Sequence, residues 1–233
     1  MKISVEDILI HHANDFHPVV PFDPAIQKIV TIDLSESNES IAEEVYCNTE
    51  LFSIWVTKFL SAHSATYAIG GYNENRKLYS RSKVFNSIEN NDEPRRLHLG
   101  MDIWGECNTP VMAPLDGVVH SFAFNNNYGD YGATIILSHY LDGCSFYTLY
   151  GHLSLNSIKN LYEGSLVRKG DVFAELGMQF ENGQWPPHLH FQIIKDMEGW
   201  KADYPGVCKL SEQIKYLSNC PDPDLILQLN KYL

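Results

Sequence analysis

The stretches that decide how this sequence folds are His98-Leu-Gly-Met-Asp102 and, later in the chain, Trp185-Pro-Pro-His-Leu-His-Phe191. A catalytic zinc ion is bound by three nitrogen or oxygen side chains and keeps a fourth position open for water. These two distant stretches supply side chains of that kind. In a β-strand, residues two apart point to the same face, so His188 and His190 are predicted to enter one pocket together. One of them would reach the metal and the other would lie beside it.

Two further motifs lie between these stretches: Thr109-Pro-Val-Met-Ala-Pro-Leu-Asp-Gly-Val-Val119 and Tyr150-Gly-His-Leu153. In this order the four motifs closely resemble those of the lysostaphin-type, LytM-like zinc metalloendopeptidases. Members of that family carry an H-x-x-x-D, a P-V-x-A-x-x-x-G-x-V strand pair, a Y-x-H-L and an H-x-H. The resemblance covers roughly residues 95–195, less than half of the chain. Each motif alone is weak, but their joint occurrence in the expected order is specific.

The resemblance implies a role for each of five residues. His98, Asp102 and His190 match the zinc ligands of the family, and the fourth position of the Zn²⁺ would hold water. His152 and His188 match the two histidines that flank this water, and the motifs leave open which one is the general base. An imidazole with a pKa near ~6.5 suits proton transfer in either direction at neutral pH. The substrate implied by the resemblance is a peptide of the peptidoglycan type.

Other residues near the motifs have candidate supporting roles. A metal-bound histidine usually donates its second N–H to a carbonyl or carboxylate, and Asp116 and Asp130 are candidate acceptors. Asp116 is followed by glycine, and a strand turn is the favoured explanation for it. Tyr150 is expected either to line a substrate groove or to pack in the core. His120 and His139 lie in strand-like sequence without a matching motif, which favours a structural role.

The segment that carries the motifs has a β pattern. β-Branched and aromatic residues are concentrated in runs over 111–124, 133–141, 145–149 and 188–194, and glycine turns separate them. We therefore predict a mainly β protein with α additions (α+β). Its catalytic core would be an antiparallel β-sheet or sandwich of LytM type, the duplicated hybrid motif fold.

Three sections are predicted along the chain. Residues 1–90 would form a partly helical N-terminal region, and the sequence leaves open whether this region covers the cleft. Residues 91–195 would form the LytM-type zinc peptidase domain. Residues 196–233 would be a C-terminal extension packed on the core, with a helix near 211–217.

Within the N-terminal region, Ser40-Ile-Ala-Glu43 is predicted to be a capping box that starts an amphipathic helix. Its apolar stripe is expected to pack on its own domain rather than on a partner. In distant relatives with the same motifs, an upstream asparagine occupies the open zinc position. Asn73 and Asn75 are candidates for that role by location only, and a glycine-rich turn is the favoured explanation for both.

Composition excludes several classes of partner. The net charge of −12 over 233 residues argues against nucleic acid and against anionic membranes, because phosphate binding needs concentrated Lys and Arg. No secretory signal is visible in residues 1–10, and no apolar run reaches the roughly 18 residues of a membrane span. A cytoplasmic location, or export by a non-classical route, is therefore expected.

The five cysteines contain no C-x-x-C, which predicts buried free thiols. The oligomeric state is left open.

Three other functions remain compatible with the sequence. Degenerate relatives act as catalytically silent or latent modules that bind or regulate, although no ligand is missing here. A phosphocarrier with a similar hybrid β-fold would use paired histidines and would not need His98 and Asp102. A hydrolase with a substrate outside the cell wall is kept open by the missing secretory signal.

Overall fold

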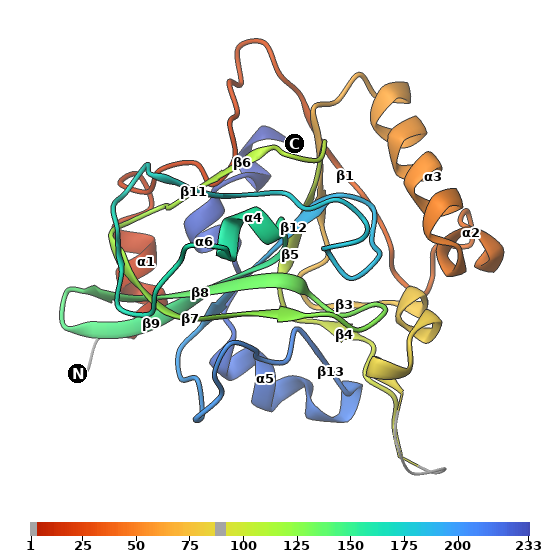
Figure 1. The fold of residues 1–233 in the computed structure, drawn as a ribbon. Coiled ribbons are helices and arrows are strands. Elements are labelled where there is room, and N and C mark those ends of the chain that lie inside the picture. Colours follow the sequence, from red (N-terminus) through yellow and green to blue (C-terminus); the bar gives the residue numbers. More distant parts are fainter. Residues whose placement is uncertain (1–3, 87–91) are drawn as a thin grey trace.

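The computed structural model describes residues 4–86 and 92–233, and its largest element is an eight-stranded β-sheet (Figure 1). The first pair of strands is parallel, and every other neighbouring pair is antiparallel. In spatial order the strands are β1 (Ile29–Thr31), β2 (Tyr67–Gly70), β5 (Met101–Trp104), β12 (His188–Ile194), β9 (Cys144–Leu153), β8 (Gly132–Leu141), β7 (Gly117–Asn125) and β10 (Leu166–Val167). The predicted class, mainly β and dominated by antiparallel pairing, is confirmed.

Two smaller sheets complete the β structure of the described residues. One pairs β11 (Val172–Glu175) with β6 (Pro110–Met112). The other has the order β13 (Val207–Cys208), β4 (Leu97–His98) and β3 (Glu74–Asn75). In this three-stranded sheet, the strand that carries His98 lies between β3, which precedes it in the chain, and β13, which follows it.

Short helices surround the sheets, and Figure 1 shows α2 and α3 on one flank and α1 on another. The α-helices are α1 (Val5–His11), α2 (Glu43–Cys47), α3 (Thr49–Ala62), α4 (Leu155–Ile158), α5 (Gln213–Asn219) and α6 (Asp224–Leu227). The 3₁₀ helices are η1 (Lys77–Arg81), η2 (Lys83–Phe85), η3 (Leu210–Glu212) and η4 (Asn230–Tyr232). Within 4–86 and 92–233, none of the helices has the length and apolar character needed to cross a bilayer.

Alternation along β12 separates the main core from the polar face of the sheet. Leu189, Phe191 and Ile193 are fully buried in the largest apolar cluster, together with residues of β5, β8 and α1. The residues between them, among which are His190 and Gln192, belong to the other face, because successive strand residues point to opposite sides. The same face of the sheet therefore receives both histidines of the H-x-H motif, as predicted.

The N-terminal helix differs from its prediction. The chain forms two helices in place of one, because Asn48 ends α2 and its Oδ1 accepts a hydrogen bond from Leu51 N at the start of α3. The predicted capping box is wrong: α2 is capped by Ala42 without a side-chain bond, and Ser40 bonds Asn38. The apolar stripe does pack within the protein, where Phe52 is fully buried in a second apolar cluster.

The C-terminal segment contains α5 close to its predicted position, and this helix ends before Pro221. Cys208 and Cys220 are buried thiols as expected, whereas Cys47 and Cys107 are exposed. β1 and β2, which precede residue 90, extend the same sheet that carries the H-x-H strand. The division of the chain at residues 90 and 195 stays a prediction.

Candidate metal and catalytic site

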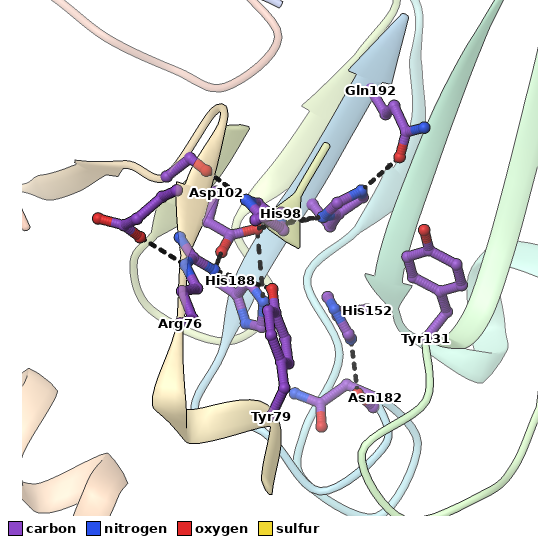
Figure 2. A network of polar contacts seen from close by, with 12 residues as sticks. Arg76, Tyr79, His98, Asp102, Tyr131, His152, Asn182, His188 and Gln192 are labelled. Atoms are coloured by element: carbon purple, nitrogen blue, oxygen red, sulfur yellow. Dashed lines mark hydrogen bonds and ion pairs between the residues drawn. The ribbon is translucent and has the colours of Figure 1, made fainter. Parts of the chain in front are cut away.

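The register of β5 against β12 brings the two distant motifs together. Asp102 lies directly opposite His190, and Trp104 lies directly opposite His188. Cross-strand neighbours on one face have Cβ atoms about 4.5–5.5 Å apart, so this pairing alone places a carboxylate beside His190 and an indole ring beside His188. Figure 2 shows Asp102 and His188 converging on this face of the sheet.

His98 reaches the same point from β4, which belongs to the three-stranded sheet. The chain passes from β4 into β5 through Leu99 and Gly100, and the second of these has to be small. A Cβ atom on Gly100 would lie 2.5 Å from Cε1 of His190 and 2.8 Å from the carbonyl oxygen of Phe191. The H-x-x-x-D motif therefore brings His98 and Asp102 together beside His190, because the glycine between them lets the backbone pass close to the His190 ring.

Three side-chain atoms face one another at this point. His98 Nε2 lies 2.8 Å from His190 Nδ1, and Asp102 Oδ1 lies 3.3 Å from the former and 3.2 Å from the latter. All three residues are buried. Ligand atoms about 2.0–2.1 Å from a tetrahedral zinc ion are themselves about 3.3 Å apart. The two distances to Asp102 Oδ1 match this value, and the distance of 2.8 Å between the two nitrogens is shorter.

Hydrogen bonds to the outer nitrogens of His98 and His190 determine which tautomer each neutral ring adopts. His98 Nδ1 donates to the carbonyl oxygen of Gly71 at 2.9 Å, and His190 Nε2 donates to Gln192 Oε1 at 3.0 Å. In the neutral rings, His98 Nε2 and His190 Nδ1 therefore both carry lone pairs, and they point at one another and at a carboxylate. Such a set of acceptors could hold a cation between them, and its two nitrogens and one oxygen suit Zn²⁺.

His152 reaches the site through an irregularity in β9. Gly151 and His152 together lie opposite a single residue of β8, Thr134, which is a β-bulge. Gly151 faces His190 across the strands, and His152 takes the left-handed conformation with φ of 63°. In a regular strand His152 would follow Tyr150 into the main core, and the bulge turns it toward the metal ligands instead.

His152 and His188 lie side by side, with ring centroids 4.1 Å apart. Their Nδ1 atoms donate to backbone carbonyls, of Asn182 for His152 and of Pro186 for His188, each at 2.8 Å. Each neutral ring therefore keeps an unprotonated Nε2, and that of His188 is 3.9 Å from Asp102 Oδ1. This geometry places two proton acceptors next to the three candidate ligands.

Burial controls the charge of these groups. It lowers the pKa of His188 to about 4 and that of His152 well below its ordinary value, where the neighbouring histidines add to the effect. The pKa of His98 falls to about 3 through burial and the nearby Arg76 guanidinium. Burial also disfavours a charged Asp102, but His98 and Arg76 hold the pKa of that carboxyl well below its usual range. At neutral pH His98, His152 and His188 are therefore uncharged and Asp102 is an anion.

All five predicted site residues line one cavity. Its walls also include the aromatic rings of Tyr79, Trp104, Tyr131, Trp185 and Tyr204. Trp104 stacks on His188 with ring centroids 3.9 Å apart and fixes the plane of that imidazole. Arg76 and Tyr79, which precede residue 90, also line the cavity. No motif around these residues predicts this position.

The two candidate supporting carboxylates do not bond the site histidines, although Asp130 lines the same cavity. Asp116 Oδ1 accepts from Lys169 N, and Asp130 accepts from Asn127 and from Tyr131 N, so neither carboxylate bonds a site histidine. Backbone carbonyls and the Gln192 amide take that role instead, so the candidate supporting role of both aspartates is wrong.

The structure decides between the two positions that were open for Tyr150, and it agrees with the structural role favoured for His139. Tyr150 is fully buried in the core, and His139 bonds the Asp116 carbonyl and Thr148. Neither Asn73 nor Asn75 lines the cavity: Asn73 is a left-handed turn residue bonded to Gln213, and Asn75 bonds Glu36. The favoured explanation as a turn residue agrees with Asn73, whereas Asn75 lies in strand β3 and not in a turn.

Comparison with known proteins agrees with this geometry. Residues 96–203, a little under half of the chain, match the sequence model of Peptidase family M23. The resemblance found in the motifs is therefore confirmed for this part of the chain.

Three similar proteins illustrate the extent of the match. An uncharacterized metalloprotease of Haemophilus influenzae is 36% identical over 99 residues, which are 42% of this chain and 18% of the relative. An L-Ala–D-Glu endopeptidase of Bacillus subtilis is 30% identical over 119 residues, 48% of this chain and 34% of the relative. The chain thus spans about a fifth and a third of these two proteins. The catalytic domain of lysostaphin from Staphylococcus simulans superposes with a TM-score of 0.40 and 23% identity, over 68% of this chain and 96% of that domain.

Proposed function

We propose that this protein is a zinc-dependent metalloendopeptidase that hydrolyses peptide bonds in peptides of the peptidoglycan type. One observation carries the proposal: His98 Nε2, His190 Nδ1 and Asp102 Oδ1 face one another within 4.8 Å, with two further histidines in the same cavity. The match to Peptidase family M23 supports peptide hydrolysis. The relative named as an L-Ala–D-Glu endopeptidase supports a substrate of the cell-wall type.

Zinc would be held by His98, Asp102 and His190. When bound in such a site, zinc polarises a carbonyl group and lowers the pKa of water towards ~7. The protein contributes the fixed orientation of the ligands: Gly71 and Gln192 hold the two imidazoles in the tautomers that leave the inner nitrogens free.

His152 and His188 supply proton transfer. Both are neutral at pH 7 and both keep an unprotonated Nε2, so either can accept the proton of an attacking water. The protonated ring can then return this proton to the leaving amine. Because carbonyl partners hold both Nδ1 atoms, the rings do not have to rotate between the two transfers. Buried, aromatic walls around them exclude bulk water and strengthen each hydrogen bond to the substrate.

Two alternative functions are less well supported. A phosphocarrier needs an accessible histidine in a site that tolerates phosphate, but the Asp102 carboxylate lies 3.9 Å from His188 and would repel that anion. A catalytically silent module would be expected to have lost a ligand or a proton acceptor. All five residues are present and converge here.

The test is digestion of purified peptidoglycan by the zinc-loaded protein, with the released fragments identified by mass spectrometry. We expect defined peptide fragments from the wild-type protein and none from His152→Ala. The identity of the new termini gives the bond that is cut. If a protein with one bound zinc releases no fragment from peptidoglycan but cleaves other peptides, the substrate part of the proposal is wrong. If it cleaves neither, the peptidase assignment is wrong.

A further inference from the structure

Arg76 lies outside the segment that matches the peptidase family, yet it contacts a candidate metal ligand. Its side chain is buried, and Nη1 donates to Asp102 Oδ2 at 2.6 Å (Figure 2). We infer that Arg76 is a positioning residue, which orients Asp102 as a one-oxygen ligand of the metal. This inference rests on the proposed metal site and adds to it a residue from the N-terminal part of the chain.

The two oxygens of Asp102 have separate partners. Oδ1 faces His98 and His190 at 3.3 and 3.2 Å, whereas Oδ2 is held on the other side by Arg76. A carboxylate with one oxygen fixed by a charged donor presents only its second oxygen to a metal, in a single orientation. Without Arg76, Oδ2 would be a buried anionic oxygen that lacks this donor, and the carboxylate would be free to rotate.

Arg76 is itself held from two further directions. Its Nε donates to Glu74 Oε2 at 2.5 Å, and Nη1 also lies 3.1 Å from the hydroxyl of Tyr79. Glu74 is fixed in turn, because its Oε1 accepts from Leu34 N at 3.2 Å. A chain of bonds therefore runs from the N-terminal segment to Asp102. Arginine suits this position because its planar group donates in several fixed directions, which a lysine ammonium does not.

The same segment also holds a second ligand. The carbonyl oxygen of Gly71 accepts from His98 Nδ1, and Glu74 pairs with His98 in the register of β3 and β4. Gly71 has a φ of 101°, and a Cβ atom there would lie 1.7 Å from Arg76 Nη2. Glycine at this position thus lets one turn approach Arg76 and His98 together. Residues 71–79 thereby support two of the three candidate ligands.

The charge of Arg76 and its hydrogen bond to Asp102 have opposite effects on the affinity for a metal ion. The positive charge of Arg76 disfavours a neighbouring cation, but the negative charge of Glu74 lies beside it and offsets most of that effect. What remains is the hydrogen bond that fixes Asp102. Removing both charges together, in the double variant Arg76→Gln/Glu74→Gln, therefore isolates the orienting role, because the net charge of the site is unchanged.

The experiment measures zinc affinity by competition with a chelator, and the absorption spectrum of the cobalt-substituted protein. In the double variant, zinc should bind about 10–100-fold more weakly, as is usual when an outer partner of a ligand is lost. The cobalt spectrum should change as well, since it reports the coordination of Asp102. Arg81→Gln is the matched control: Arg81 is a neighbouring arginine that bonds Thr49 and Tyr128 and contacts none of the ligands. It should leave both readouts unchanged.

Unchanged zinc affinity and an unchanged cobalt spectrum in a folded double variant would overturn the role of Arg76. If that variant does not fold, Arg76→Lys replaces it, because one ammonium group cannot hold Asp102 and Glu74 in the same geometry. A loss of about 10-fold in zinc affinity is then expected, and wild-type affinity would refute the inference. Failure of the wild-type protein itself to bind zinc would instead refute the proposed metal site, so the two failures are distinguishable.

Discussion

His98 Nε2 and His190 Nδ1 lie 2.8 Å apart although 92 positions separate the two residues in the sequence. Both nitrogens carry lone pairs in the tautomers that their outer partners impose, and Asp102 Oδ1 adds negative charge beside them. Replacing His190 by alanine removes one of only three protein ligands. We expect the affinity for zinc to fall at least about 100-fold, since each ligand contributes a few kcal/mol to binding. Chelator competition on wild-type and His190→Ala proteins measures this. Equal affinities would exclude His190 from the metal site.

His152→Ala should separate binding from catalysis. His152 lies beside His188 but is absent from the group of three facing ligand atoms, so zinc affinity should stay within about threefold of wild type. The turnover number should fall by about 10²–10⁴-fold, the usual contribution of a general acid or base. Stopped-time peptide cleavage with zinc-saturated protein provides the measurement. Full turnover in a zinc-loaded His152→Ala protein would assign proton transfer to His188 alone.

Gly100→Ala tests the close approach of the backbone to the metal site. The new Cβ atom would lie 2.5–2.6 Å from the His190 ring and would push Nε2 away from Gln192. Zinc should then bind about 10-fold more weakly, because the tautomer and orientation of His190 are no longer fixed. Gly105→Ala is a matched control, since its Cβ atom would meet only the ring of Tyr67, at 2.8 Å. Loss of zinc affinity in both variants alike would point to general destabilisation rather than to this contact.

The buried His139 predicts how stability depends on pH away from the site. Burial lowers its pKa to about 4 in the folded protein, from 6.5 in the unfolded chain. Above pH 6.5 neither state binds the proton, so the full stability is present there. As the pH falls from 6.5 to about 4, the unfolded state gains a proton that the folded state does not bind. The free energy of unfolding therefore decreases by roughly 3 kcal/mol.

His139→Gln removes this proton-binding group. The variant should be less stable at pH 7, because the bonds to Thr148 and to the Asp116 carbonyl are disturbed, but it should lose less stability on acidification. Urea unfolding of the two metal-free proteins between pH 7 and pH 4 gives the difference, in which the other titrating groups cancel. Parallel stability curves for the two proteins would show that His139 does not titrate as stated.

Much of the site follows from local sequence. The period of two along the H-x-H strand predicts that His188 and His190 share a face, and the four β runs predict the strands around it. By contrast, His152 reaches the site only through a bulge and a left-handed backbone. A regular alternation would have placed it in the core, so its position came from the resemblance and not from the pattern.

The contribution of the N-terminal segment was not predictable. Arg76 follows a glycine-rich stretch that indicates only a loop, and its contact with Asp102 depends on how β3 packs beside β4. The split between α2 and α3 was missed for a related reason: the apolar stripe continues through Asn48, whose side chain nevertheless caps a new helix. The local sequence is compatible both with one continuous helix and with two helices separated at Asn48. Tertiary contacts select between them, and these contacts cannot be predicted from the local pattern.

We propose that one zinc ion, held by His98, Asp102 and His190, is required for peptide hydrolysis. The most direct test of this proposal is a titration of the metal-free protein with zinc, in which peptide cleavage is followed at each addition. We expect cleavage to rise in proportion to zinc up to one equivalent per chain and then to stay constant, and we expect no such rise for Asp102→Ala. Cleavage that is independent of zinc, or that reaches its maximum equally in Asp102→Ala, would contradict it.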